Sequence, residues 1–178
     1  MDAFVFMLHR DNPVDGLTLE QVRGIYSGEI TNWSEVGGKD EEIVPLTRNE
    51  TSGSQGLMRE LVMGSAEMVA GTAFEGITMS APVAGVRGHP TGIGYSVFYY
   101  MHFMSPDPRV KLAEIEGVAP TSETIRSGAY PLCSEVYAVI KAGLRESSLA
   151  RRLRDWLLTE DGQRVIAESG YVPISKAQ

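Results

Sequence analysis

Apolar runs bounded by turn-forming residues predict the strands of this chain. Residues 3–8 are continuously apolar and lead into a turn, which is typical of a buried strand. Shorter runs predict a strand at 43–46 and another entered from the glycine-bearing stretch 91–97. Residues 110–115 alternate as in an exposed strand, and residues 133–140 form the last strong strand signal.

Apolar positions at helical spacing, preceded by capping residues, predict the helices. Thr18 followed by Gln21 is a capping box, and it opens a helix through residue 26. A second cap, Thr121, opens a short helix that ends at Ser127. Further helices are predicted after Gly53, near Pro82 in a first-turn position, and in the tail. The tail helices cover 147–158 and 160–167.

Composition and charge limit the class of protein and its partners. The 178 residues are 43% hydrophobic and 8% aromatic, which is enough for one core or two small lobes of a globular protein. The net charge of −7 provides no basic face, so we expect neither nucleic acid nor an anionic membrane as a partner. No apolar run is long enough to span a membrane, and the first eight residues lack the basic start of a signal peptide.

Cysteine and histidine provide no predicted metal or cofactor site. Cys133 is the only cysteine, so an intrachain disulfide or a multi-cysteine zinc site is excluded. It is expected to be a small buried or half-buried residue rather than a reactive thiol. His9, His89 and His102 are scattered along the chain without ligand spacing.

The strongest candidate for chemistry is an anion site between the strand at 43–46 and the helix that follows. Arg48, Ser52, Gly53 and Ser54 lie within seven residues at the predicted start of that helix. Unpaired N–H groups and the partial positive charge at a helix N-terminus favour an oxyanion there. Hydroxyl donors and a guanidinium fork add to it. Read structurally, the same residues are an ordinary helix cap and a surface arginine.

An enzymatic reading takes Ser52 or Ser54 as a nucleophile. Residues 53–56 fall one residue short of a Gly-x-Ser-x-Gly nucleophile elbow, and no histidine stands in a recognisable relation to them. The chain is therefore not expected to be an enzyme.

Taken together, these motifs resemble the phosphate-binding proteins of ABC phosphate importers over nearly the entire chain. The Tyr-Ser-Gly-Glu-Ile-Thr-Asn-Trp block at 26–33 and the Arg48 to Ser54 block are specific in combination. Other matching blocks are 3–6, 12–14, 17–21, 36–38, 93–95, 117–121, 130–132 and 170–173.

The resemblance implies an α/β fold of the type II periplasmic-binding-protein class, which closes on phosphate between two lobes. Residues 1–140 correspond to the second lobe, with a mixed sheet, flanking helices and crossing strands at 3–8 and 136–140. Residues 141–178 correspond to C-terminal helices that belong to the first lobe. Family members begin with a further segment that builds much of that first lobe. No match to it occurs here, so an incomplete first lobe is expected.

By the same resemblance, Arg48, Ser52, Gly53 and Ser54 would bind phosphate, and Glu50 would pair with Arg48 behind them. The implied partners are inorganic phosphate and the membrane permease of an ABC transporter, in an extracytoplasmic location. A domain of this fold that has lost its ligand, serving in sensing or adhesion, is the alternative.

The tail carries an apolar face at helical spacing whose partner in the family would be the first-lobe sheet. Its members are Leu149, Leu153, Trp156, Leu157, Val165 and Ile166. An uncovered face of this kind is expected to be covered in a homodimer, or to displace the tail helices from their family position.

Overall fold

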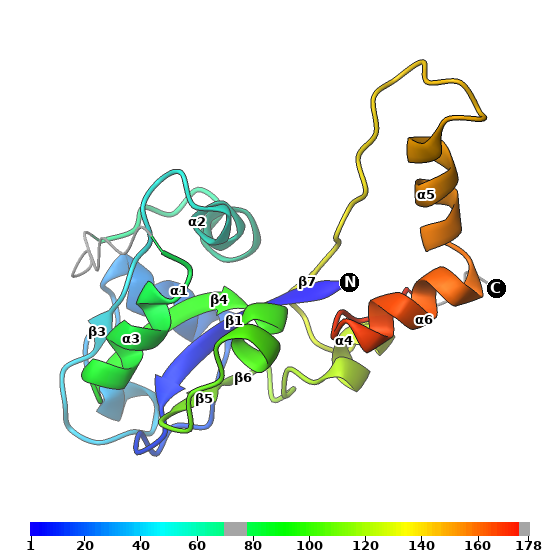
Figure 1. The fold of residues 1–178 in the computed structure, drawn as a ribbon. Coiled ribbons are helices and arrows are strands. Elements are labelled where there is room, and N and C mark those ends of the chain that lie inside the picture. The colour runs from blue at the N-terminus through cyan, green and yellow to red at the C-terminus, as the bar shows by residue number, and fades with distance from the viewer. Residues whose placement is uncertain (70–77, 175–178) are drawn as a thin grey trace.

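The computed structural model describes residues 1–69 and 78–174, which form a body built on one mixed sheet and a pair of helices that projects from it (Figure 1). The strands run in the order β3 (Val44–Pro45), β4 (Gly92–Val97), β1 (Asp2–His9) and β5 (Val110–Leu112), and β7 (Cys133–Ser134) pairs with the start of β1. β1 is antiparallel to its three partners, whereas β3 and β4 are parallel. The predicted α/β class with a mixed sheet is confirmed.

Helices connect and flank these strands, and a small second sheet lies beside them. β2 (Gly16–Leu17) pairs in parallel with β6 (Glu114–Ile115). The α-helices are α1 (Leu19–Ser27), α2 (Gly53–Leu57), α3 (Ala81–Gly88), α4 (Ser122–Ser127), α5 (Leu149–Leu157) and α6 (Glu160–Glu168). A 3-10 turn, η1 (Trp33–Val36), and two π-helical segments, η2 (Met58–Met63) and η3 (Tyr100–Met104), complete the set.

The core is centred on β1, in which all eight residues are buried. Because side chains alternate along a strand, Phe4 and Phe6 share one face. There they meet Tyr95 of β4 and Tyr26 of α1, with ring centroids 5.3–6.3 Å apart. Aromatic rings at these separations pack edge-to-face and restrict one another.

The opposite face of the sheet is closed by α3. A side chain at Gly94 would come within 3.1 Å of Val86 of α3 and 3.4 Å of Met7 of β1. The glycine therefore allows the helix to approach the sheet closely. With α1 on one face and α3 on the other, β1 reads as a continuous apolar run rather than an alternating one.

The predicted caps are present and define the helix starts. Thr18 Oγ1 accepts the N–H of Gln21 at 3.1 Å, and Gln21 Oε1 accepts the N–H of Thr18 at 2.8 Å, which is the predicted capping box. Thr121 caps α4 in the same way, with Thr124 as its reciprocal partner.

The predicted strand at 133–140 is wrong for most of its length. Only Cys133 and Ser134 pair, opposite Ala3 and Asp2, and no strand is assigned to residues 135–140. Val139 is 89% exposed. The reason is that β1 begins at Asp2, so the β-prone residues that follow Ser134 have no neighbouring strand to pair with.

The predicted exposed strand at 110–115 is divided and largely buried. β5 pairs with the end of β1, the chain steps across at Ala113, and β6 then joins the second sheet. The N–H of Ala113 donates to the carbonyl of Phe6 at 2.9 Å. Val110, Ala113 and Ile115 are all buried, because the segment joins the two sheets instead of forming an edge.

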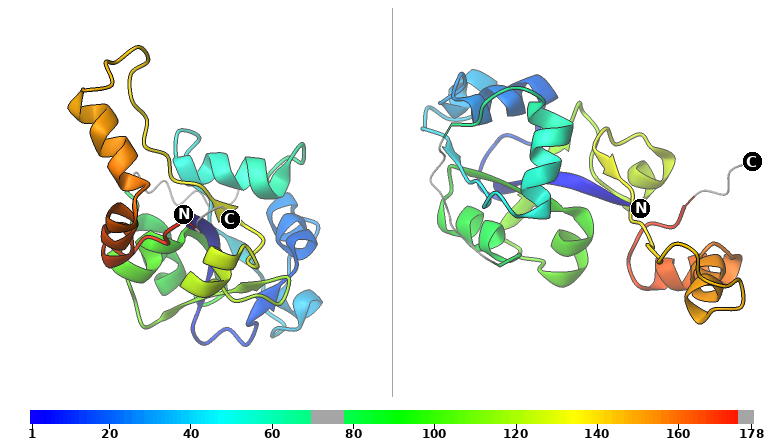
Figure 2. Two further views of the ribbon diagram at one scale, coloured as in Figure 1. Left: turned by 90° about the vertical axis from the view of Figure 1, so that its right-hand side faces the viewer. Right: turned by 90° about the horizontal axis from the view of Figure 1, so that it is seen from above.

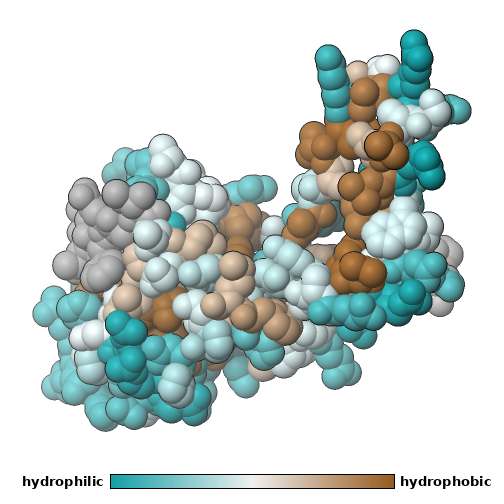
Figure 3. Space-filling view, in the orientation of Figure 1, coloured by the Kyte–Doolittle hydropathy of each residue, from teal (hydrophilic) through white to brown (hydrophobic). Residues whose placement is uncertain are grey.

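We call α5, α6 and the segment 135–148 that leads to them the arm. α5 and α6 pack against each other and lie away from the body, beyond the N-terminal end of β1 when seen from above (Figure 2). Hydrophobic residues gather on the arm (Figure 3). Leu149 is 79% exposed and Leu153 is 57% exposed, and no residue of α5 is buried.

The arm rejoins the body beside the N-terminus. The N–H of Val172 donates to the carbonyl of Met1 at 3.2 Å, and the amino group of Met1 donates back to the carbonyl of Val172. Tyr171 stacks on Tyr99, with centroids 3.8 Å apart and planes 2° from parallel. The arm is thus attached at β7 on one side and at residues 171–172 on the other, both next to the first residues of β1.

Candidate anion-binding site

The site lies where the chain leaves the sheet after β3 and turns into α2. β3 and β4 are parallel, and the N–H of Leu46 still donates to the carbonyl of Ile93 at 2.8 Å. Two residues later the N–H of Arg48 donates to the side-chain hydroxyl of Tyr95 at 3.0 Å. The backbone of Leu46 thus still pairs with the backbone of β4, whereas the backbone of Arg48 contacts only a side chain of that strand.

The Arg48 side chain is held by two neighbours. Its Nε donates to Ser52 Oγ at 3.2 Å, and Nη1 donates to the carbonyl of Thr78. The residue is only 9% exposed. A guanidinium has five donors, and within residues 1–69 and 78–174 the Nη2 group has no hydrogen-bond partner.

The start of α2 supplies backbone donors. The N–H of Ser52 is used in a turn to the carbonyl of Asn49 at 3.0 Å, and the first helical bond runs from Gly56 to the carbonyl of Ser52 at 3.1 Å. Among the described residues, the N–H groups of Gly53 and Ser54 have no backbone acceptor. Unpaired N–H groups at the positive end of a helix bind oxyanions.

Two further features keep this helix start open to a small anion. Ser52 Oγ and Ser54 Oγ lie 3.0 Å apart and hydrogen-bond to each other. Ser52 makes no side-chain cap to the helix, so its hydroxyl is not committed to the backbone. A Cβ placed on Gly53 would have nothing within 4 Å, so the glycine leaves space that is not filled by the described residues.

Glu50 does not pair with Arg48 as expected. Its carboxylate forms an ion pair with Arg59 in η2, and the two side chains are 67% and 55% exposed. The described ion pairs include none between Glu50 and Arg48. The reason is local geometry: Arg48 turns inward to Ser52 and Thr78, whereas Glu50 lies on the exposed side of the turn.

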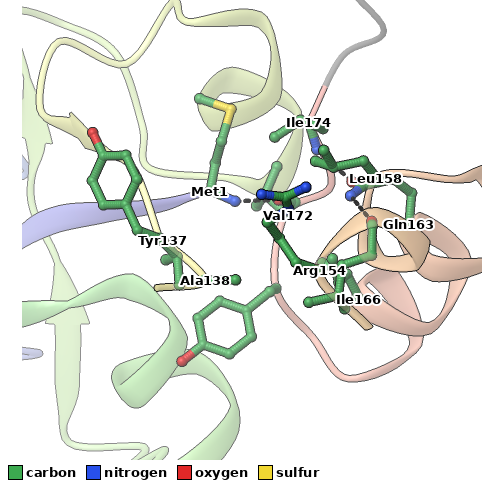
Figure 4. Close-up of a pocket in the computed structure, with 12 residues that line it drawn as sticks. Met1, Tyr137, Ala138, Arg154, Leu158, Gln163, Ile166, Val172 and Ile174 are labelled. Atoms are coloured by element: carbon green, nitrogen blue, oxygen red, sulfur yellow. Dashed lines mark hydrogen bonds between the residues drawn. The ribbon is translucent and has the colours of Figure 1, made fainter. Parts of the chain in front are cut away.

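A polar cavity of about 450 Å³ adjoins the site, and Arg48, Glu50, Gln55 and Arg59 are among the residues that line it. Ser52, Gly53 and Ser54 are not part of its lining. A second cavity, of about 440 Å³, lies between the arm and the start of β1, where Met1, Tyr137, Arg154, Gln163 and Ile166 surround it (Figure 4). Its lining is mostly apolar and contains none of the predicted site residues.

Three supporting residues were not predicted as part of the site. Tyr95 and Thr78 accept hydrogen bonds from Arg48 although they are distant from it in the sequence, and Gln55, in the first turn of α2, accepts the hydroxyl of Tyr95. Burial raises the pKa of Tyr95 to about 12, so its hydroxyl stays protonated and can both accept and donate a hydrogen bond.

No described side chain that could accept a proton contacts the serine hydroxyls. In residues 1–69 and 78–174, the side-chain partners of Ser52 and Ser54 are Arg48 and each other. A serine nucleophile needs an adjacent group that takes its proton, and a guanidinium cannot. The arrangement suits anion binding.

The described part of the chain contains no group of three or more His, Cys, Asp or Glu side chains that could hold a metal ion. None of its helices is both long enough and apolar enough to cross a membrane. Cys133 is half-buried, and burial raises the pKa of its thiol.

Comparison with known proteins gives a consistent set of similarities. The profile of the PBP superfamily domain matches residues 1–161. The phosphate-binding protein PstS of Bacillus subtilis is 29% identical over 177 residues, which is 97% of this chain and 56% of that protein. The chain thus spans a little over half the length of this curated relative.

Two solved structures share the fold. An ABC-type phosphate transport receptor from Vibrio cholerae is 28% identical, with a TM-score of 0.76 over 96% of this chain and 69% of its own. A protein from Clostridium perfringens, crystallised with bound phosphate and assigned as a phosphate ABC transporter substrate-binding protein, is also 28% identical. Its TM-score is 0.75 over 98% of this chain and 69% of its own.

Proposed function

This chain belongs to the PBP superfamily and has the periplasmic-binding-protein fold, and from that premise we propose that it binds inorganic phosphate as a substrate-binding component of an ABC-type phosphate uptake system. One observation carries the proposal. Arg48, the Ser52 and Ser54 hydroxyls and the unpaired N–H groups of α2 meet at the end of β3, in a chain similar to proteins named for phosphate binding.

The proposed site would hold phosphate by short-range contacts. Ser52 and Ser54 now hydrogen-bond to each other, and both hydroxyls can rotate to donate to an anion instead. Arg48 has donors without a partner among the described residues, and Ser52 and Thr78 fix its side chain, so little ordering is needed on binding. A chain with a net charge of −7 repels anions at long range, so affinity must come from these oriented donors.

The organisation of the chain is proposed on the same basis. Residues 1–140 act as the second lobe of a two-lobed binding protein, and residues 141–178 act as helices of the first lobe. The membrane permease of an ABC transporter is the proposed partner, and the proposed location is extracytoplasmic. We also propose that the apolar surface of α5 is covered by a second copy of the chain, because Leu149 and Leu153 are exposed on it.

Arg48→Ala tests the proposed site. The variant removes a charge-assisted contact worth about 1.5–3 kcal/mol, which corresponds to a loss of roughly 10- to 150-fold in phosphate affinity. Isothermal titration calorimetry with phosphate and with sulfate measures the affinity and the selectivity. Arg87→Ala is the matched control, since Arg87 lies in the last turn of α3 and its ion-pair partner is Asp107.

Two outcomes would contradict the proposal. If Arg48→Ala binds phosphate as the parent does, Arg48 is not a ligand. If the folded parent protein gives no heat and no thermal shift with phosphate, the chain is a member of the fold without this ligand.

A further inference from the structure

We propose that Tyr95 is a positioning residue for this site. Its hydroxyl joins Arg48, at the start of the loop formed by residues 48–55, to the first turn of α2, and so sets where the guanidinium lies relative to the helix N-terminus. The inference rests on the proposed phosphate site and adds to it a residue that does not touch the ligand. Tyr95 lies 47 positions from Arg48 in the sequence and reaches the loop only through the fold.

One oxygen atom closes both ends of the loop. Tyr95 Oη accepts the backbone N–H of Arg48 at 3.0 Å and donates to Oε1 of Gln55. Residues 48–55 contain every predicted ligand, and their first and last members are both fixed to this hydroxyl. Tyr95 is fully buried and Gln55 is 3% exposed, and hydrogen bonds between buried groups are stronger than those made in water.

The position of the hydroxyl is itself fixed by the core. The Tyr95 ring lies 5.5 Å from Phe4 and from Tyr26, and 6.3 Å from Phe6, measured between centroids. Its backbone is paired with Phe6 in the centre of the sheet. A ring held on three sides places its oxygen at one point, which is the requirement for a residue that supports a binding site.

The hydroxyl also explains how Arg48 leaves the sheet without an unpaired amide. Parallel pairing with β4 has ended at Leu46, and a buried N–H without an acceptor is costly. By accepting that N–H, Tyr95 lets the chain turn toward α2 at Arg48. The guanidinium can then reach Ser52 in the same turn.

Tyr95→Phe removes only the hydroxyl and keeps the ring in its aromatic cluster. We expect phosphate affinity to fall at least tenfold in calorimetric titration. Tyr130→Phe is the matched control, because Tyr130 is 1% exposed and donates its hydroxyl to the carbonyl of Phe4 at 3.1 Å, away from the loop. The control should lose comparable thermal stability and keep its affinity within twofold.

Gln55→Met supplies a second variant on the same connection and serves if Tyr95→Phe does not fold. The double variant should bind no more weakly than the weaker single variant, because both changes break one connection. Additive losses, or an affinity of folded Tyr95→Phe within twofold of the parent, would overturn the positioning role.

A measurement without ligand separates this inference from the proposed function. Amide hydrogen exchange by NMR should show the Arg48 N–H exchanging at least tenfold faster in Tyr95→Phe, and unchanged in Tyr130→Phe. If the parent binds no phosphate, the proposed function fails while this result still decides the positioning role. An Arg48 amide that stays equally protected in Tyr95→Phe would refute it.

Discussion

At the scale of single residues, the proposed site is made of groups that hydrogen-bond to one another in the absence of a ligand. Ser52 accepts from Arg48 and bonds to Ser54, and Thr78 accepts from Arg48. The donors are therefore oriented beforehand, and phosphate binding would exchange the neutral bond between the two serines for charge-assisted ones, which are about twice as strong.

Glu50 provides a residue-scale prediction. Glu50→Gln should change phosphate affinity less than threefold and the free energy of unfolding by less than about 1 kcal/mol, because its ion pair with Arg59 is exposed. Calorimetry and urea denaturation measure the two quantities. A tenfold loss of affinity would mean that Glu50 orients Arg48 in solution, contrary to the pairing described here.

The local part of the site could be predicted from sequence, and the supporting part could not. Arg48, Ser52, Gly53 and Ser54 lie within one strand-to-helix connection, where spacing alone indicates a helix start. Tyr95 joins them through the register of β4, which no local pattern encodes. Arg48 and Arg59 both lie within reach of Glu50, and their spacing in the sequence does not show which of them forms the ion pair.

At the scale of elements, α5 is an amphipathic helix whose apolar side faces solvent. Light scattering should give twice the mass of the 19.4 kDa chain as protein concentration rises, because an apolar helix face in water favours association. Leu153→Lys should return the protein to the monomer mass. Met104→Lys, which alters an exposed side chain on η3, is the control. A monomer at every concentration would remove the proposed dimer.

The elements that sequence predicted well are those with local determinants. α1 begins and ends where Thr18 and Gly28 place it, because a capping box and a left-handed glycine act within one turn. The predicted strand at 133–140 failed because strand formation needs a neighbour, and β1 offers one only as far as Asp2. β-propensity without a partner strand does not define a strand.

At the scale of the whole molecule, the buried tyrosines predict alkaline instability. Burial raises the pKa of Tyr26 well above 10, that of Tyr95 to about 12, and that of Tyr130 further. A pKa that is higher in the folded than in the unfolded protein means that folding favours the neutral tyrosine. The contribution of these tyrosines to the free energy of unfolding is therefore fully present below pH 10 and is lost as the pH rises through the pKa of the folded state.

Urea denaturation across pH 8–11.5 tests this sign. The free energy of unfolding should be nearly constant to pH 9 and fall above pH 10, with Tyr95 alone accounting for a loss of about 2 kcal/mol by pH 11.5. Tyr95→Phe should show a shallower decline. A flat profile to pH 11.5 in the parent would contradict it.

The double attachment of the arm gives the molecule a mechanical character. β7 pairs with Asp2 and Ala3, and Val172 pairs with Met1, so both connections bear on the outer end of one strand. That strand is clamped by the sheet along the rest of its length. The first three residues are therefore the point about which α5 and α6 can rotate as a unit. A rotation of a few degrees at Met1 to Ala3 would move the tip of α5 by several ångströms and leave the sheet unchanged.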